Sequence, residues 1–242
     1  MDRRNFLKVA GATGALVAVS PSSITQKLYA SNGMMYTAYE RVQLVDGNGA
    51  PIKASQLKKE INYVFNYPHV GTPALLLNLE DATATDVKLT AETGEEYVWK
   101  SGVGKERSIV AYSAICSHQL AHPTPSDSFL QYVQKTKKTM AYDTGGVIVC
   151  SSHLSAFDAK AGAKRLSGPA VDALASVVIE VADDDSVWAV GVLGVDRFHD
   201  YFKSFKPEFK EFYGGKRKAK KLVKISAKTV VLNEYTKEII QY

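Results

Sequence analysis

Cysteine and histidine are scarce in this sequence: its 242 residues include two cysteines, Cys116 and Cys150, and five histidines. Two cysteines exclude a disulfide-rich framework and allow at most one disulfide within the chain. The net charge is only +5, and neither an aromatic-rich nucleic-acid signature nor a helix-turn-helix pattern accompanies it. We therefore expect no nucleic acid partner.

The composition is that of a globular protein, with 45% hydrophobic and 23% charged residues. A chain of this length can bury one good core, or one core plus a small subdomain. Part of the basic excess sits in residues 216–221, so it does not describe a basic face spread over the fold. We interpret this run as a solvated or partner-facing surface.

The first 30 residues have the pattern of a twin-arginine export signal. Arg3 and Arg4 are followed by Phe-Leu-Lys and then by a weakly apolar stretch over residues 9–19. This stretch is shorter than the roughly 20 apolar residues that a membrane-spanning helix needs. We expect export to the periplasm and cleavage after Ala30, and the alternative is that 1–30 stay on the chain as a membrane anchor.

The twin-arginine route carries chemical information because it moves proteins that are already folded. Folding before export is needed when a cofactor must be inserted in the cytoplasm, so a bound cofactor is expected. In an oxidising compartment, the competing interpretation of Cys116 and Cys150 is a single disulfide.

Short apolar or alternating segments separated by turn-forming residues follow the signal, and they predict an all-β fold of the antiparallel sandwich or barrel type. Helical turns are expected at 56–60 and over 129–138, and the tail from residue 196 shows no clear period. The expected strands are 37–45, 61–65, 74–79, 97–99, 108–115, 147–149, 177–181 and 187–192.

Two motifs each combine one thiol with one imidazole: Cys116-Ser117-His118 and Cys150-Ser151-Ser152-His153. Each follows a strand-like segment that can hold it in place. A structural zinc site with two cysteines and two histidines usually opens with both cysteines and closes with both histidines. Mixed pairs suit a two-iron cluster in which one iron takes both thiolates and the other both imidazoles. Zinc and a disulfide remain the alternatives.

These motifs resemble the cluster loops of the Rieske iron–sulfur proteins, which read C-x-H and C-x-x-H. Residues 153–158 are similar to the continuation of the family's second loop, and 168–170 are similar to its proline loop. Upstream, 65–74 and 109–113 are similar to the small subunit of arsenite oxidase. The resemblance covers roughly residues 40–194.

The resemblance implies one [2Fe-2S] cluster per chain and assigns its ligands. They are Cys116, His118, Cys150 and His153. It also implies a Rieske-type β domain over residues 36–194, with a small cluster-binding subdomain at about 112–170. An aromatic and basic extension over 195–242 follows that domain.

The resemblance also implies that four further residues adjust the properties of the cluster. Ser155 stands where the family places a hydroxyl that hydrogen-bonds a cluster sulfur, and Phe157 stands where high-potential members have a tyrosine. Gly168 and Pro169 belong to the proline loop that covers the cluster. No catalytic residue is assigned.

This sequence departs from the family at the loop tips. Ala121 and Ser152 occupy the places of two further cysteines that tie the loops in many members, so the loops need support from packing. Gln119 and Leu120 change the exposed tip, which puts docking to a quinone pocket in doubt. The extra piece over 129–142 is expected to form a lobe beside the cluster.

The function implied is electron transfer. The resemblance points to the small subunit of a periplasmic oxidoreductase with a larger, molybdopterin-containing partner and a cytochrome or other electron acceptor. The alternative is a Rieske subunit of a quinol-oxidising membrane cytochrome complex. A Rieske oxygenase needs a second, catalytic domain with a mononuclear iron site, for which the chain is too short. His69, His122 and His199 are assigned no role.

The aromatic tail is expected to expose apolar surface to a partner, because interface cores favour aromatic residues. Packing of these rings on their own domain is the alternative. The residues concerned are Phe198, Tyr201, Phe202, Phe205, Phe209, Phe212 and Tyr213.

Overall fold

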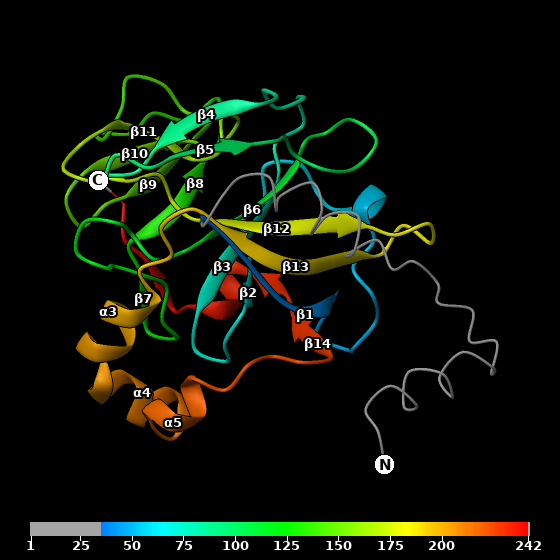
Figure 1. The fold of residues 1–242 in the computed structure, drawn as a ribbon, viewed down its shortest axis with the longest axis vertical. Helices are drawn as coiled ribbons and strands as arrows, with labels where there is room; N and C mark the ends of the chain where they lie inside the picture. The colour runs from blue at the N-terminus through cyan, green and yellow to red at the C-terminus, as the bar shows by residue number, and fades with distance from the viewer. Residues whose placement is uncertain (1–34, 242) are drawn as a thin grey trace, which may run out of the picture.

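The structure is a computed structural model that describes residues 35–241. The expected export signal and its cleavage after Ala30 lie outside the described residues. Most regular structure is β, as the sequence predicts, and it centres on one eight-stranded sheet (Figure 1). Its strands, in spatial order, are β14 (Ser226–Lys228), β1 (Tyr36–Val45), β13 (Val187–Leu193), β12 (Ser176–Val181), β6 (Ile109–Ser113), β3 (Pro73–Asn78), β2 (Tyr63–Asn66) and β15 (Val230–Val231).

Both faces of this sheet are apolar at its centre. In β3, Leu75 and Leu77 point into one hydrophobic core, whereas Ala74 and Leu76 point into a second core on the other face. All four side chains are fully buried. Successive side chains of a strand alternate between faces, so a strand that is apolar at every position needs cover on both sides. That requirement positions both the sheet that holds the second Cys/His motif and the C-terminal helices.

A four-stranded sheet, which holds the second Cys/His motif, covers the first face. Its order is β11 (Lys164–Ser167), β10 (Ser155–Asp158), β9 (Val147–Cys150) and β8 (Leu130–Val133). The first core includes Cys116 and Cys150 together with Ile148 and Phe157. The expected ligand-bearing cysteines therefore lie between the two sheets. A hairpin of β4 (Val87–Thr90) and β5 (Glu96–Trp99) flanks this core.

The prediction of a helix over residues 129–138 is wrong. Residues 130–133 form strand β8, in which Leu130 pairs with Cys150 and Tyr132 pairs with Ile148. The side chain of Asn62 accepts a hydrogen bond from the Tyr132 backbone N–H at 2.6 Å and donates one to its carbonyl at 2.9 Å. These long-range contacts fix residues 130–133 as a strand, and they make the start of 129–142 part of the sheet that holds the second Cys/His motif.

All eight expected strands are present, as β1, β2, β3, β5, β6, β9, β12 and β13. The helical turn expected at 56–60 is displaced: a short 3-10 helix occupies Ala54–Gln56 instead. The strands that were not expected are short or polar, such as β7 (Asp127–Ser128) and β16 (Glu238–Ile239), which pair with each other in parallel. Among residues 35–241, no helix is long and apolar enough to cross a membrane.

The tail covers the second face with three helices, α3 (Phe198–Ser204), α4 (Lys206–Tyr213) and α5 (Lys216–Ala219). The expectation that its aromatic rings are exposed is wrong: four of them are at most 5% exposed and belong to the second core. Taken over all its residues the tail shows no clear period, but its aromatic residues alone recur every three or four positions, which is a helical spacing, and the apolar sheet face needed cover. The buried rings are Phe198, Tyr201, Phe202 and Phe209.

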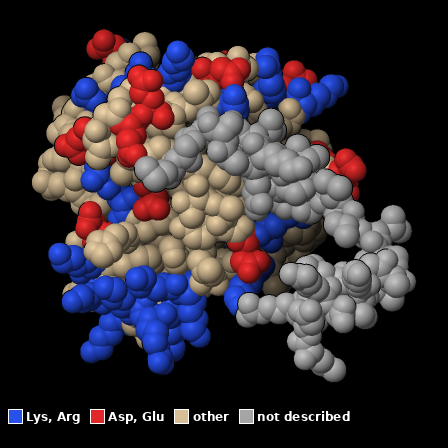
Figure 2. Space-filling model, in the orientation of Figure 1, with Lys and Arg blue, Asp and Glu red and all other residues tan. Residues whose placement is uncertain are grey.

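The end of the chain is woven into the main sheet. Strands β14 and β15 form its two edges, and the short helix α6 (Leu232–Tyr235) follows β15. The basic side chains of the helical tail gather at one end of the molecule, whereas both charge signs are interleaved near β4 and β5 (Figure 2).

Candidate metal centre

The first motif occupies a tight loop directly after β6. The backbone N–H of Cys116 donates to the carbonyl of Ala121 at 2.9 Å, and the N–H of Leu120 donates to the carbonyl of Cys116 at 3.0 Å. Leu120 has a φ of 62°, in the left-handed region. The loop therefore turns back on itself, which leaves Gln119 exposed at its tip and Cys116 buried at its base.

The second motif forms the turn between β9 and β10. Cys150 pairs with Ser155 across these strands, so residues 151–154 make the reversal, and Leu154 has a φ of 56°. Cys150 is 1% exposed and His153 is exposed. The two loops are thus arranged alike: in each, the cysteine is buried and the histidine lies closer to the surface.

The two thiols lie within hydrogen-bonding reach of each other, and they are not joined in a disulfide. A hydrogen bond from Cys150 and the backbone N–H groups of His118 and Gln119 hold the pKa of the Cys116 thiol below its ordinary value. The shared proton and burial raise the pKa of Cys150, although the N–H groups of Ser152 and His153 face its sulfur. Each sulfur therefore meets two backbone donors, an arrangement that favours thiolates.

The two imidazoles lie against each other at the mouth of this site. The ring centroids of His118 and His153 are 4.8 Å apart, and the rings are nearly perpendicular at 89°. The Nδ1 atom of His118 is buried and has no hydrogen-bond partner. A buried ring nitrogen without a partner is costly unless it binds something, and a neutral imidazole nitrogen is a common metal ligand.

The donor set fits a two-iron cluster better than a single ion. Within residues 35–241, no three His, Cys, Asp or Glu side chains gather around one point as a mononuclear site requires. Instead, the four expected ligands form one thiol pair and one imidazole pair. A cluster that brings its own sulfides needs only two protein ligands per iron, which matches two separate pairs.

The proline loop lies over the second motif. A Cβ on Gly168, which has a φ of 79°, would lie 2.5 Å from the carbonyl oxygen of Leu154 and from the Cα of Ser155, so only glycine fits. The N–H of Ala170 donates to the Ser155 hydroxyl at 3.1 Å. Within the described chain this hydroxyl accepts one bond and donates none, so its proton is free for another acceptor. Phe157 is fully buried nearby in β10.

A contact between His122 and helix α4 supports the first loop. His122 Nε2 lies 2.9 Å from Glu208 Oε2, and its Nδ1 lies 2.8 Å from the Leu120 carbonyl oxygen. The ring packs against Tyr201 and Phe205, with both centroid distances 4.7 Å. We call this contact the His122–Glu208 clamp. It ties the loop to the C-terminal helices, in a chain that lacks the disulfide tie.

Sequence reasoning missed this clamp because Glu208 is 86 residues from His122. The only signal was the helical spacing of the aromatic tail. Of the other histidines, His199 is exposed, but His69 is half-buried among Tyr39, Phe198 and Phe202. Burial lowers the pKa of His69 to about 4.

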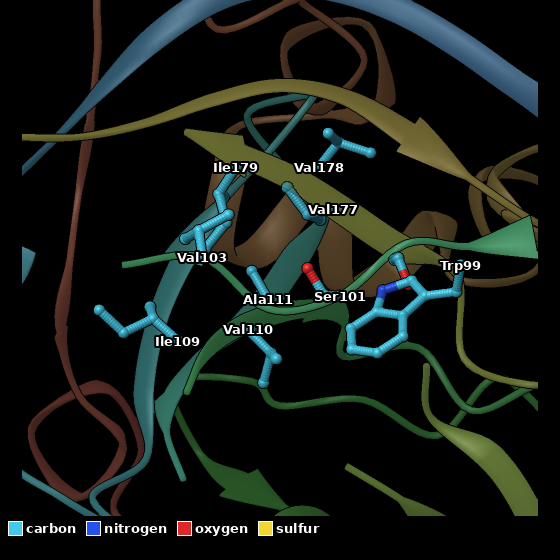
Figure 3. A pocket seen from close by; sticks show the side chains of 10 residues that line it. Trp99, Ser101, Val103, Ile109, Val110, Ala111, Val177, Val178 and Ile179 are labelled. Carbon is cyan, nitrogen blue, oxygen red and sulfur yellow. The ribbon is translucent and has the colours of Figure 1, made fainter. Parts of the chain in front are cut away.

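Two cavities elsewhere have no expected ligand in their walls. One of about 20 Å³ lies between β6 and β12, which pair only at Tyr112 and Ser176 (Figure 3). It has room for a single water molecule. The other, of about 220 Å³, lies beside β8 and the C-terminal strands. Neither cavity is therefore part of the site formed by the two Cys/His motifs.

Comparison with known proteins agrees with these observations. Residues 1–20 match the twin-arginine translocation pathway signal sequence, and residues 76–178 match the Rieske [2Fe-2S] domain. The second match spans both motifs and the proline loop. Similarity to a solved structure, the soluble domain of Rieske protein II (soxF) from Sulfolobus acidocaldarius, is limited to a TM-score of 0.44 and 24% identity, over 64% of this chain and 78% of that one.

Two curated relatives share most of the chain. Iodate reductase subunit IdrB of Denitromonas iodatirespirans is 29% identical over 195 residues, 81% of this chain and 83% of the relative. The subunit of the same name from Pseudomonas sp. (strain SCT) is 28% identical over 208 residues, 86% and 87% of the two chains. This chain therefore combines a twin-arginine signal for export to the periplasm with a Rieske [2Fe-2S] domain over residues 76–178, a domain that holds one [2Fe-2S] cluster.

Proposed function

We propose that Cys116 and Cys150 hold one iron of the cluster and that His118 and His153 hold the other. The proposal is supported by the two buried thiols, the paired imidazoles and the partnerless Nδ1 of His118. When bound, the cluster supplies a one-electron step at a potential raised by its two neutral imidazole ligands.

The protein's own residues set the conditions for that step. The two cysteines are 1% exposed, so their thiolates are kept from water and from external oxidants. The Ser155 hydroxyl is poised to donate to a cluster sulfur. His153 is exposed, so the imidazole side is the side that a redox partner can approach. Electron transfer needs that close approach and no bound substrate.

We also propose that the chain is the small electron-transfer subunit of a periplasmic oxidoreductase of the arsenite-oxidase type. Its larger subunit would contain molybdopterin, and a cytochrome or another carrier would exchange electrons with the pair. The observation that carries this proposal is similarity over more than four fifths of two proteins that are named as subunits of iodate reductase. Nothing in residues 35–241 favours the alternative, a quinol-oxidising cytochrome complex.

The ligand assignment is tested by substitution. We expect two irons and two labile sulfides per chain, with a rhombic electron paramagnetic signal on reduction. Replacing any one of Cys116, His118, Cys150 and His153 by alanine should abolish this signal, and replacing exposed His199 should not. A signal that survives unchanged in the His118 and His153 variants would overturn the assignment.

The subunit proposal is tested by isolating the native protein under mild conditions. We expect it to elute with a larger subunit that contains molybdenum, and we expect the iron and molybdenum contents to follow one elution profile. A monomer that rapidly passes electrons to quinone analogues would contradict the proposal and favour the membrane cytochrome alternative.

A further inference from the structure

The helical tail carries a concentrated positive charge. Residues 203–224 hold nine basic and two acidic side chains, a net charge of +7, whereas the whole chain carries only +5. The rest of the molecule is therefore slightly acidic, with a net charge of −2. The blue side chains of this segment gather around α4 and α5 in Figure 2. We call this surface, with the exposed aliphatic side chains described below, the basic face.

These cations have no carboxylate partners, unlike several cations elsewhere in the described chain. Within residues 35–241, none of the nine basic side chains forms an ion pair with a carboxylate, and all but Lys216 are exposed. By contrast, Lys135 and Lys160 both contact Asp81, and Lys100 contacts Asp86. Unpaired like charges on neighbouring positions repel one another, so the basic face is electrostatically unfavourable in the isolated chain.

The basic face is nevertheless anchored to the domain. The N–H of Gly71 donates to the Ala219 carbonyl at 2.9 Å, and the N–H of Val70 donates to the Lys221 carbonyl at 2.9 Å. A Cβ on Gly71 would lie 2.8 Å from the Cβ of Ala219, so the two backbones are in close contact. The cations are therefore presented on a fixed surface and not on a loose tail.

Apolar side chains lie beside these cations. Val70 is 36% exposed, Leu222 is 42% exposed and Ile225 is 82% exposed. They are three of the five large hydrophobic residues that are exposed in the described part of the chain. A β-bridge between His69 and Leu222 places Val70 next to Leu222. We call Val70, Leu222 and Ile225 the aliphatic strip. Exposed aliphatic side chains with charged neighbours are the composition of a protein interface, an apolar centre with a polar rim.

We propose that the basic face binds an acidic surface of the larger redox subunit, an inference that rests on the proposed function. Complementary charge would steer the encounter, and the aliphatic strip would supply the contact area. A redox protein fits better than a membrane because, through the His122–Glu208 clamp, the same helices contact the first cluster loop. A partner bound to the basic face therefore lies beside the loop that carries two of the proposed ligands, Cys116 and His118.

Charge reversal tests the steering part of the proposal. The holoprotein with Lys216→Glu, Arg217→Glu and Lys218→Glu is compared with a control that reverses Lys88, Lys105 and Lys164, which are exposed elsewhere. The probe is the larger subunit isolated from the native host. At low salt we expect Kd to rise about 30-fold or more for the basic-face variant and a few-fold at most for the control, with the difference shrinking at high salt.

Aliphatic substitution tests the contact part. Ile225→Ser with Leu222→Ser should weaken binding about 10-fold at any salt concentration, whereas Met140→Ser, at a residue 71% exposed elsewhere, should not. The iron content and the electron paramagnetic signal should be unchanged in every variant, which shows that the domain is intact.

Three results would overturn the inference. Equal affinity of the basic-face variant and its control would exclude steering by this surface. Binding of wild-type protein to vesicles with anionic lipid, lost in the basic-face variant while subunit binding persists, would assign the face to the membrane. A basic-face variant that changes only self-association would assign it to a second copy of the chain. If the wild-type protein binds no larger subunit at all, the proposed function itself fails.

Discussion

Removing the carboxylate of Glu208 should loosen the first cluster loop. Glu208 lies 2.9 Å from Nε2 of His122, whose side chain is only 5% exposed. The other ring nitrogen already lies 2.8 Å from the Leu120 carbonyl oxygen, and the ring is packed against Tyr201 and Phe205. In Glu208→Ala, the imidazole therefore keeps its position but loses the acceptor for Nε2.

The size of the effect follows from this burial. A buried donor left without a partner costs about 1–3 kcal/mol. The cost applies only while the loop is docked, since an opened loop exposes His122 to water. The opened population should therefore rise about 5- to 150-fold, because 1.4 kcal/mol is a factor of ten. An opened loop exposes the cluster, so its loss to a chelator should accelerate by a similar factor.

The assay follows the bleaching of visible absorption in excess chelator. Glu211→Ala is the matched control, because Glu211 is an exposed glutamate on the same helix. Glu208→Gln keeps an acceptor oxygen and should lie between wild type and Glu208→Ala. If Glu208→Ala loses its cluster at the wild-type rate while its thermal unfolding is also unchanged, the clamp does not hold the loop.

Three further predictions concern the cluster environment and export. Ser155→Ala should lower the reduction potential and Phe157→Tyr should raise it, each by roughly 45 to 90 mV if one hydrogen bond to sulfur gains about 1 to 2 kcal/mol on reduction; voltammetry without a shift in either variant would remove the hydrogen-bond argument. Gly168→Ala should destabilise the proline loop because its Cβ meets the Ser155 backbone at 2.5 Å, which a lower midpoint of cluster bleaching on heating would report; an unchanged midpoint would show that the loop can shift freely. Replacing Arg3 and Arg4 by lysine should leave folded, iron-loaded protein in the cytoplasm, and its normal accumulation in the periplasm would contradict the assigned export route.

The motifs themselves could be read from the sequence because they are local. Cys116 and His118, like Cys150 and His153, are separated by one or two residues, so one short loop brings each pair together wherever the loop lies. The expected strands were found for a similar reason, because period-2 alternation and turn residues act within a few positions. The export signal is likewise a contiguous pattern.

Long-range contacts decided what local patterns could not. A short helix was expected over 129–138, yet pairing with β9 and the Asn62 side chain makes residues 130–133 a strand. The aromatic tail suggested an exposed interface, yet the second face of the main sheet needed cover and took the rings inward. In both cases the free energy of burial depends on a partner that is distant in sequence.

The sequence by itself determined the all-β class, the two Cys/His loops and the route of export. Only the tertiary structure decided how the loops are supported, because His122 and Glu208 are 86 residues apart and meet only when α4 packs on the sheet. The basic face also depends on the tertiary structure. When the helical tail packs on the sheet, its aromatic rings turn inward and its cations remain exposed.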